Sequence, residues 1–201
     1  QRQMCIRDSS GLPVDVPAMT INEVCGSGMK AVILARQLIQ LGEAELVIAG
    51  GTESMSQAPM LKQYQSETNE YGEPISSMVN DGLTDAFSNA HMGLTAENVA
   101  TQFSVSREEQ DRYALSSQLK AAHAVEAGVF SEEIIPVKIS DEDVLSEDEA
   151  VRGNSTLEKL GTLRTVFSEE GTVTAGNASP LNDGASVVIL ASKEYLSLIH
   201  I

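Results

Sequence analysis

The chain has 201 residues and a formal net charge of −16, with 42% hydrophobic and 21% charged residues. This is the composition of a folded globular protein, and the length suffices for one well-buried domain or for part of a larger protein. The acidic balance argues against nucleic acid or an anionic membrane as a partner, because both need basic patches. No apolar run reaches membrane-spanning length. Two cysteines make no disulfide framework, so we expect a cytoplasmic location.

Both ends of the chain differ in pattern from its middle. Residues 1–9 (QRQMCIRDS) have no clear period and lack the apolar core of a signal peptide. Residues 196–201 (LSLIHI) break off just after a predicted helix start. We therefore expect both segments to be non-native tails, with the native sequence of a fragment between them. Cys5 lies in the first tail and is given no role.

A cysteine lies where a short apolar run meets a long helical pattern. Residues 16–21 predict a strand, and residues 29–41 carry apolar side chains at helical spacing. Cys25 would then lie on the first turn of the helix, where free N–H groups and the helix dipole favour a thiolate. A second apolar run, residues 45–51, predicts a strand that ends in a turn at paired glycines. Strand, helix and strand predict a βαβ unit with parallel pairing.

Spacing alone leaves two interpretations of Cys25 open. One is a nucleophile, activated by its place at the start of a helix. The other is a buried structural thiol, since free cysteine is among the most buried residue types.

The middle of the chain contains a long polar section and then a strongly patterned helix. Residues 56–88 are too long for a simple connection, which predicts a lid or an oligomer contact. Helical patterning resumes at residues 94–100. A longer helix is expected to begin with a capping box formed by Ser106 and Glu109, and to stop before Gly128.

The last third of the chain is expected to be mostly loop. Residues 141–149 are an acidic run, for which we predict a solvated loop. Ser155 and Glu158 predict a second capping box over a short helix. The small residues of 171–184 allow close backbone approach to a ligand, or are simply a tight turn. An apolar strand is expected to follow at 185–190.

Five blocks of the sequence together resemble the thiolase family. In chain order they are NEVCGSGMKAV, VIAGGTESMSQAP, DGLTDAF, HMGLTAENVA and GTVTAGNASPLNDGA. The resemblance covers residues 15–190 and is greatest to the short-chain members, the acetyl-CoA acetyltransferases. It implies an α/β protein with the thiolase-like layered αβαβα fold, in which an incomplete N-terminal domain carries an inserted α/β loop domain.

The resemblance also implies a division into domains. Residues 10–55 and 176–195 correspond to the first and last parts of the N-terminal thiolase domain. Residues 56–175 correspond to the loop domain, which is expected to bind CoA and make oligomer contacts. The motifs of the family's second domain, Asn-Glu-Ala-Phe, Gly-His-Pro and Cys-x-Gly-Gly, do not occur here. Because those motifs supply the base and the acid, we expect this chain to be inactive alone.

In thiolases the cysteine at the position of Cys25 accepts an acyl group from a CoA thioester. The resemblance therefore predicts an acyltransferase that condenses two acetyl-CoA to acetoacetyl-CoA plus CoA, or cleaves 3-ketoacyl-CoA in reverse. A thioester intermediate divides one difficult step into two easier ones. CoA thioesters are the expected substrates, without a permanently bound cofactor or a metal. A homo-oligomer, dimer or tetramer, is expected for the full-length protein.

Four further residues take a role from the resemblance. His91 and Met92 would line the acyl pocket, which favours acetyl and acetoacetyl groups. Arg152 would lie near the CoA adenine, although a solvated charge beside an acidic run is the alternative. Ser179 would contact the pantetheine arm.

Two residues depart from the family's pattern. Lys159 stands where some close relatives place a CoA-contacting serine. Pro180 stands where glycine is common; it lacks an amide N–H and fixes φ, so the loop at Ser179 is expected to differ in detail.

Two other functions remain open. A 3-ketoacyl synthase-like enzyme also places a cysteine at a helix start, but the loop-domain blocks argue against it. A non-catalytic CoA- or lipid-binding relative would keep the fold without an activated thiol.

Overall fold

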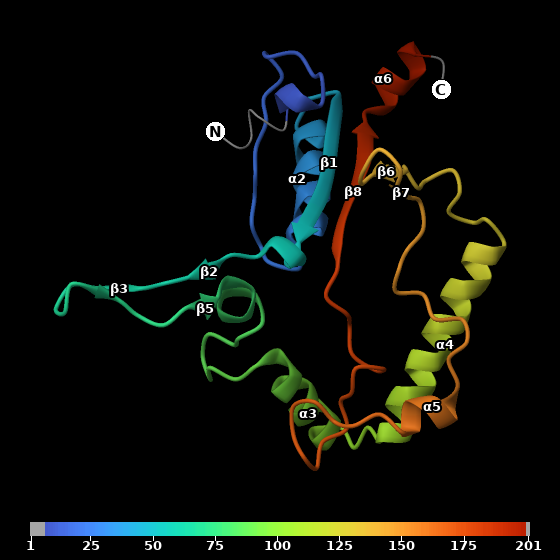
Figure 1. Cartoon of the computed structure of the whole chain (residues 1–201). Coiled ribbons are helices and arrows are strands. Elements are labelled where there is room, and N and C mark those ends of the chain that lie inside the picture. The colour runs from blue at the N-terminus through green and yellow to red at the C-terminus, as the bar shows by residue number, and fades with distance from the viewer. Residues whose placement is uncertain (1–6, 200–201) are drawn as a thin grey trace. The chain divides into compact units, whose positions relative to one another are not determined.

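The computed structural model describes residues 7–199 (Figure 1). The chain forms two compact units, one of Gln1–Pro59 with Asn182–Ile201 and the other of Met60–Leu181. The first unit therefore combines segments from the two ends of the sequence, whereas the second is continuous.

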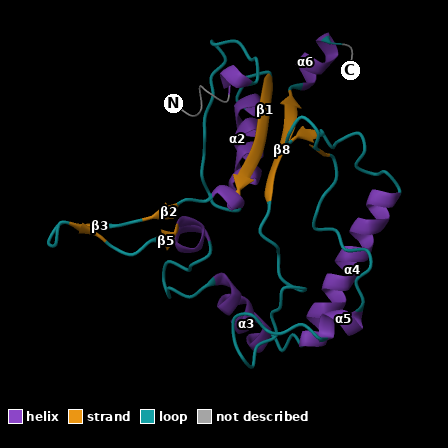
Figure 2. Ribbon diagram, in the orientation of Figure 1, coloured by secondary structure: helices purple, strands orange, loops and turns teal. Residues whose placement is uncertain are grey.

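The first unit is a helix packed on a two-stranded sheet. Helix α2 (Ser27–Gln40) lies along strand β1 (Leu46–Ser54), which pairs antiparallel with β8 (Asp183–Ala191) (Figure 2). Among the described residues of this unit, the buried apolar side chains are Ala35 of the helix and Ala49 of the strand. A short 3₁₀ helix, η1 (Met55–Gln57), follows β1, and α6 (Lys193–Leu198) follows β8.

The structure contradicts the predicted parallel βαβ unit. Residues 17–22 have no regular secondary structure, so the strand expected at 16–21 is wrong. The partner of β1 is β8, more than a hundred residues further along, and the pairing is antiparallel. A strand exists only where another segment satisfies its backbone groups, and that segment cannot be recognised from a local apolar pattern.

The paired glycines also act differently from the prediction. Gly50 and Gly51 lie inside β1, which continues to Ser54, and they do not form a turn. A Cβ atom at Gly50 would overlap the carbonyl oxygen of Ser186 on β8. The glycine is therefore needed for close approach of the two strands, a common reason for glycine inside a strand.

The second unit, all of whose residues are described, consists of three short strand pairs, one π-helix and three α-helices. Strands β2 and β5 pair with each other, as do β3 and β4. The rings of Tyr64 and Tyr71 lie beside each other across the second pair, with centroids 5.4 Å apart and planes tilted by 59°. The elements are β2 (Met60–Leu61), β3 (Tyr64–Gln65), β4 (Glu70–Tyr71), β5 (Ile75–Ser76), the π-helix η2 (Met78–Gly82), α3 (Met92–Gln102), α4 (Arg107–Glu126), β6 (Val137–Lys138), β7 (Val144–Leu145) and α5 (Leu157–Gly161). The polar section 56–88 thus contains a hairpin and a π-helical turn.

Helix α4 begins and ends where the sequence predicts. Ser106 is its N-cap and forms the full capping box with Glu109. Gly128 follows the C-cap with φ of +66°, and its N–H donates to the carbonyl of Val125. A left-handed glycine at this position is a common helix stop because it has no Cβ to clash. The acidic run 141–149 is exposed throughout, as predicted, but it is not all loop, because strand β7 lies within it.

The second predicted capping box is displaced by one residue. The N-cap of α5 is Thr156, whose hydroxyl accepts a hydrogen bond from the N–H of Lys159. Ser155 instead donates its hydroxyl to the carbonyl of Arg152. Two neighbouring hydroxyl residues offer the same capping group, and the extended backbone of Thr156 selects it. Within the described part of the chain, no helix is long and apolar enough to cross a membrane.

Asp183, the first residue of β8, provides a test of the first unit at low pH. The hydroxyl and the N–H of Ser56 both donate to its carboxylate, and they lower the pKa of Asp183 below its ordinary value. A lowered carboxyl pKa stabilises the folded state above the unfolded pKa of about 3.9, and this contribution disappears as pH falls through the folded pKa.

We expect Ser56→Ala to raise the pKa of Asp183 toward its ordinary value, because the hydroxyl makes the largest contribution. An NMR titration of the Asp183 carboxyl measures this shift. Ser186→Ala, on the same strand, is the control and should leave the titration unchanged. An unaltered pKa in Ser56→Ala would mean that the hydrogen bond does not form in solution.

Candidate active site

Cys25 lies just before α2, and its thiol is exposed. The N-cap of the helix is Gly26, so Cys25 stands one residue outside the helix and not on its first turn as predicted. The exposed thiol is not the buried structural cysteine that was the alternative to a nucleophile. An accessible sulfur beside the positive end of a helix has the position that a nucleophile requires.

A strained turn holds the backbone in front of Cys25. Val24 has φ of +50°, a left-handed conformation that is unusual for a β-branched residue. The Asn22 side chain accepts from the Val24 N–H at 2.9 Å. The Ser27 hydroxyl accepts from the Glu23 N–H at 2.8 Å and donates to the Val24 carbonyl at 2.7 Å. These hydrogen bonds support a conformation that costs about 1–3 kcal/mol by itself.

His91 is the N-cap of α3 and is fixed on two sides. Its Nδ1 accepts from the Gly93 N–H at 3.0 Å, and its ring stacks on Phe167 with centroids 4.9 Å apart. A ring nitrogen that accepts a hydrogen bond carries no proton, so the N–H of this ring is on Nε2. A Cβ at Gly93 would overlap the Phe167 ring, and glycine is therefore required for the stack. Met92 follows and is 37% exposed.

The remaining predicted site residues are on exposed loops. The Arg152 N–H donates to the Gln118 side chain at 2.7 Å, while the Arg152 side chain is exposed. Ser179 is exposed in the segment between α5 and β8. Lys159 lies in α5, and its ammonium donates to the carbonyl of Asn154 at 3.2 Å.

Residues 171–179 are held by α3 through the carboxylate of Glu97. It accepts from the N–H groups of Thr172 and Val173 at 2.9 and 2.8 Å, and from the Thr172 hydroxyl at 2.9 Å. Partial burial works to raise the pKa of Glu97, but these three donors together lower it below its ordinary value. Hydrogen bonds to the ionised form stabilise it, so the loop is fixed by a carboxylate.

The same loop is joined to α4 by a buried polar cluster. Asp111 is only 3% exposed, and its two oxygens accept from the Arg107 guanidinium at 2.8 Å and from the Asn177 amide at 3.0 Å. Arg107 also donates to the carbonyl of Leu160 in α5, at 2.6 Å. Buried polar groups of this kind are stable only when each has its partners, and here they do.

The structure brings the segments of His91 and Ser179 into one framework. Phe167, on which His91 stacks, belongs to a segment paired with the start of the loop through a bridge between Thr165 and Thr174. Val166 donates to the carbonyl of Val173 at 3.1 Å in the same pairing. Cys25 belongs to the first unit, and the other four predicted site residues belong to the second.

Three residues that shape the site, Glu97, Asp111 and Asn177, were not predicted from the amino-acid sequence. Glu97 and Asn177 fall inside the blocks that resemble thiolases, but nothing in their local pattern indicates a shared loop. Asp111 had only a weak signal, its spacing of four residues from Arg107 on a helix.

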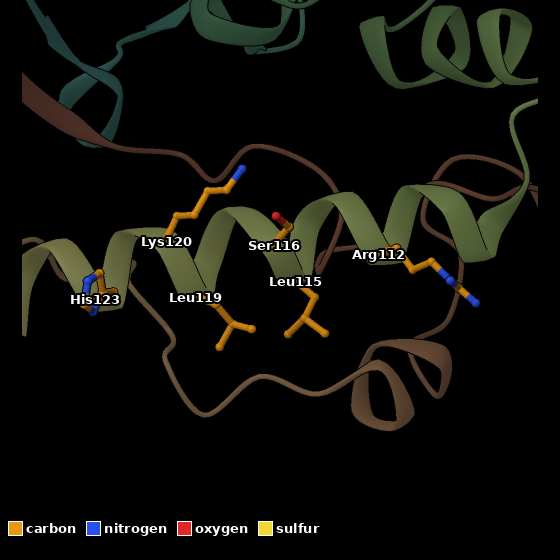
Figure 3. A pocket seen from close by; sticks show the side chains of 6 residues that line it. All are labelled: Arg112, Leu115, Ser116, Leu119, Lys120 and His123. Carbon is orange, nitrogen blue, oxygen red and sulfur yellow. The ribbon is translucent and has the colours of Figure 1, made fainter.

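Away from these residues, the described part of the chain has a hollow along α4. Figure 3 shows this hollow, which is lined by side chains of that helix alone, among them Leu115 and Leu119. None of the five predicted site residues lines it. Among residues 7–199, no group of three or more His, Cys, Asp or Glu side chains is placed to hold a metal ion.

Comparison with known proteins identifies the class to which this fold and cysteine belong. Residues 1–194 match the family model described as the thiolase N-terminal domain. The chain therefore belongs to the thiolase family, and the fold class predicted from the sequence is confirmed.

Individual relatives agree with this assignment. A protein of Staphylococcus aureus (strain COL) named probable acetyl-CoA acyltransferase is 50% identical over 190 residues, which are 92% of this chain and 48% of that protein. A protein of the same name from Staphylococcus epidermidis (strain RP62A) is 48% identical over 190 residues, which again are 92% of this chain and 48% of that protein. The structure of human mitochondrial 3-ketoacyl-CoA thiolase in complex with CoA matches with a TM-score of 0.90 at 40% identity, covering 98% of this chain and 50% of that one. The chain thus spans about half the length of the curated relatives it matches.

Proposed function

We propose that this chain is the cysteine-bearing part of a thiolase-type acyltransferase acting on CoA thioesters, with Cys25 as the acyl acceptor. The observation that carries the proposal is an exposed cysteine in a strained turn before α2, in a chain that belongs to the thiolase family. Related proteins named acetyl-CoA acyltransferase, and a related thiolase whose structure contains CoA, support the substrate class.

In the first step, the Cys25 thiolate attacks the thioester carbonyl of an acyl-CoA. The carbon–sulfur bond to CoA breaks, CoA leaves as a thiolate, and the acyl group remains as a thioester on Cys25. The N–H groups of Gly26 and Ser27 already donate to carbonyls of the preceding turn. The next N–H groups at the start of α2, those of Gly28 and Met29, can donate to the developing oxyanion. In the second step, the α-carbon of another acyl-CoA loses a proton to a base and attacks this thioester; the carbon–sulfur bond to Cys25 breaks, and Cys25 leaves as a thiolate.

In the degradative direction Cys25 attacks the 3-keto carbonyl, the carbon–carbon bond breaks, and acetyl-CoA leaves after its α-carbon gains a proton. The thiolate of CoA then attacks the acyl group on Cys25 and releases the Cys25 thiolate.

We also propose short acyl groups, acetyl and acetoacetyl, as the preferred substrates. The support is the pair His91 and Met92, of which His91 is held rigidly by its cap and by Phe167. A rigid ring with one Nε2–H donor suits recognition of a thioester or amide carbonyl. Arg152 and Ser179 are proposed as CoA contacts, since both are exposed on loops of the second unit. The homo-oligomer and the cytoplasmic location stay predictions.

Thiolysis of longer 3-ketoacyl-CoA is the second candidate, favoured by the name of the human relative. Comparing kcat/KM for acetoacetyl-CoA and for a long-chain 3-ketoacyl-CoA, in the full-length protein, separates the two. We expect at least about a tenfold preference for acetoacetyl-CoA, which corresponds to roughly 1.4 kcal/mol in transition-state binding. A preference for the long chain would contradict the proposed specificity without affecting the role of Cys25.

A further inference from the structure

The loop that carries Ser179 has part of its backbone inside the core of the second unit. Val173 is 7% exposed and Thr174 is fully buried. A buried backbone must find hydrogen-bond partners within the protein. The partner of the Thr174 N–H is the side-chain oxygen of Asn177, at 2.8 Å.

Asn177 uses both ends of its amide to shape this loop. While its oxygen accepts from Thr174, its nitrogen donates to the carboxylate of Asp111 at 3.0 Å and to the carbonyl of Thr172 at 3.1 Å. The oxygen of an amide accepts and its nitrogen carries two N–H donors, so one asparagine side chain can make all three contacts at once. Replacing either end therefore leaves at least one buried group without a partner.

Asp111, which accepts from this amide, is itself held in place. Its second oxygen is bound to Arg107, which is bound in turn to the carbonyl of Leu160. Asn177 thus connects the loop to two helices, α4 and, through Arg107, α5.

Little conformational freedom remains between Asn177 and the predicted ligand contact. Ala178 donates its N–H to the Thr174 carbonyl at 3.0 Å. Pro180 follows Ser179 and fixes its own φ, which also restricts the residue before it. Ser179 itself is exposed and free to meet a ligand.

We propose that Asn177 is a positioning residue for CoA binding: its amide, held by Asp111, places Ser179 where it contacts the pantetheine arm. The inference rests on the proposed function, in which Ser179 is a CoA contact. Asn177 itself is assigned no contact with the substrate.

Asn177→Asp tests this role in the 201-residue chain. The variant has the same shape, but its carboxylate cannot donate and would face the carboxylate of Asp111 and the carbonyl of Thr172. We expect amide hydrogen exchange of residues 174–179 to become at least about tenfold faster, since one unpaired buried group weakens a local structure by that factor or more. Exchange in the central turns of α4 should stay unchanged.

Two further variants complete the exchange experiment. Asn98→Asp makes the same chemical change at an exposed position of α3 and should alter nothing. Asn177→Ser adds no charge but is too short to reach Asp111, so it should also accelerate exchange of the loop. If Asn177→Asp does not fold, exchange in Asn177→Ser shows whether Asn177 holds the loop.

A compensating pair tests the direct contact. Combining Asp111→Asn with Asn177→Asp restores a donor facing an acceptor between the two positions. Loop exchange in the double variant should therefore be slower than in Asn177→Asp. If loop exchange in the double variant is equal to or faster than in Asn177→Asp, the contact between positions 111 and 177 is not what holds the loop.

Binding of CoA tests whether the position of the loop affects the ligand. Calorimetric titration of the chain with CoA should show an affinity about tenfold weaker for Asn177→Asp than for Asn98→Asp, about 1.4 kcal/mol. Three results for Asn177→Asp would each overturn the positioning role. The first is faster exchange of the loop with an unchanged affinity for CoA. The others are faster exchange over the whole second unit and unchanged exchange of the loop. Absence of CoA binding by the wild-type chain would overturn the proposed CoA contact, and exchange would still decide whether Asn177 holds the loop.

Discussion

Replacing Cys25 by serine is expected to abolish formation of a covalent acyl-enzyme from acetyl-CoA. The thiolate is the nucleophile, whereas a serine hydroxyl stays protonated near neutral pH unless a base removes its proton. The position of the side chain in front of α2 would be unchanged, so the variant removes the chemistry and keeps the fold.

The measurement is the mass of the full-length protein after incubation with acetyl-CoA. The wild-type protein should gain one acetyl group, and Cys25→Ser should gain none. Cys5→Ser, made in the full-length protein with residues 1–9 retained, is the matched control and should be labelled like the wild type; Cys5 lies outside the described residues. Normal labelling of Cys25→Ser would remove Cys25 as the acyl acceptor.

The reactivity of the Cys25 thiol also distinguishes an enzyme from a non-catalytic relative. An unactivated cysteine reacts slowly with iodoacetamide near neutral pH. Rapid alkylation of Cys25 in the Cys5→Ser variant would support a nucleophile. A rate equal to that of a free cysteine in a peptide would favour a binding protein without thiolase chemistry.

Replacing Asp111 by alanine is expected to destabilise the second unit by roughly 3 kcal/mol, the low end of the range for breaking a buried ion pair. The low end applies because the Arg107 side chain is one quarter exposed and keeps some hydration. The change leaves that guanidinium without its carboxylate and takes an acceptor from the Asn177 amide. The loop 171–179 would therefore loosen together with α4.

Urea unfolding followed by circular dichroism measures this loss. Asp141→Ala is the matched control, since Asp141 forms an ion pair with Lys138 in which the carboxylate is almost fully exposed. Exposed pairs contribute less than about 1 kcal/mol. A loss for Asp111→Ala no larger than that for Asp141→Ala would show that the buried cluster does not support the unit.

Local features of the fold were predictable to different degrees. Both ends of helix α4 were predicted because the capping box at its start and the left-handed glycine at its end are each local signals that involve residues no more than about four positions apart. The N-cap of α5 was predicted one residue too early, since Ser155 and Thr156 offer the same hydroxyl and only backbone conformation distinguishes them. Strand pairing was predicted incorrectly, because β8 lies far from β1 in the sequence.

The family, the helices and the candidate nucleophile could be predicted from the amino-acid sequence, since ordered blocks of residues and short-range hydrogen bonds carry that information. The folded structure was needed to identify the strand partner of β1, the need for glycine at position 50 and the exposure of Cys25. It also decided the arrangement of Glu97, Asp111 and Asn177 around the loop of Ser179. These contacts join residues more than sixty positions apart, and buried polar groups choose their partners by proximity in space, which a local pattern does not contain.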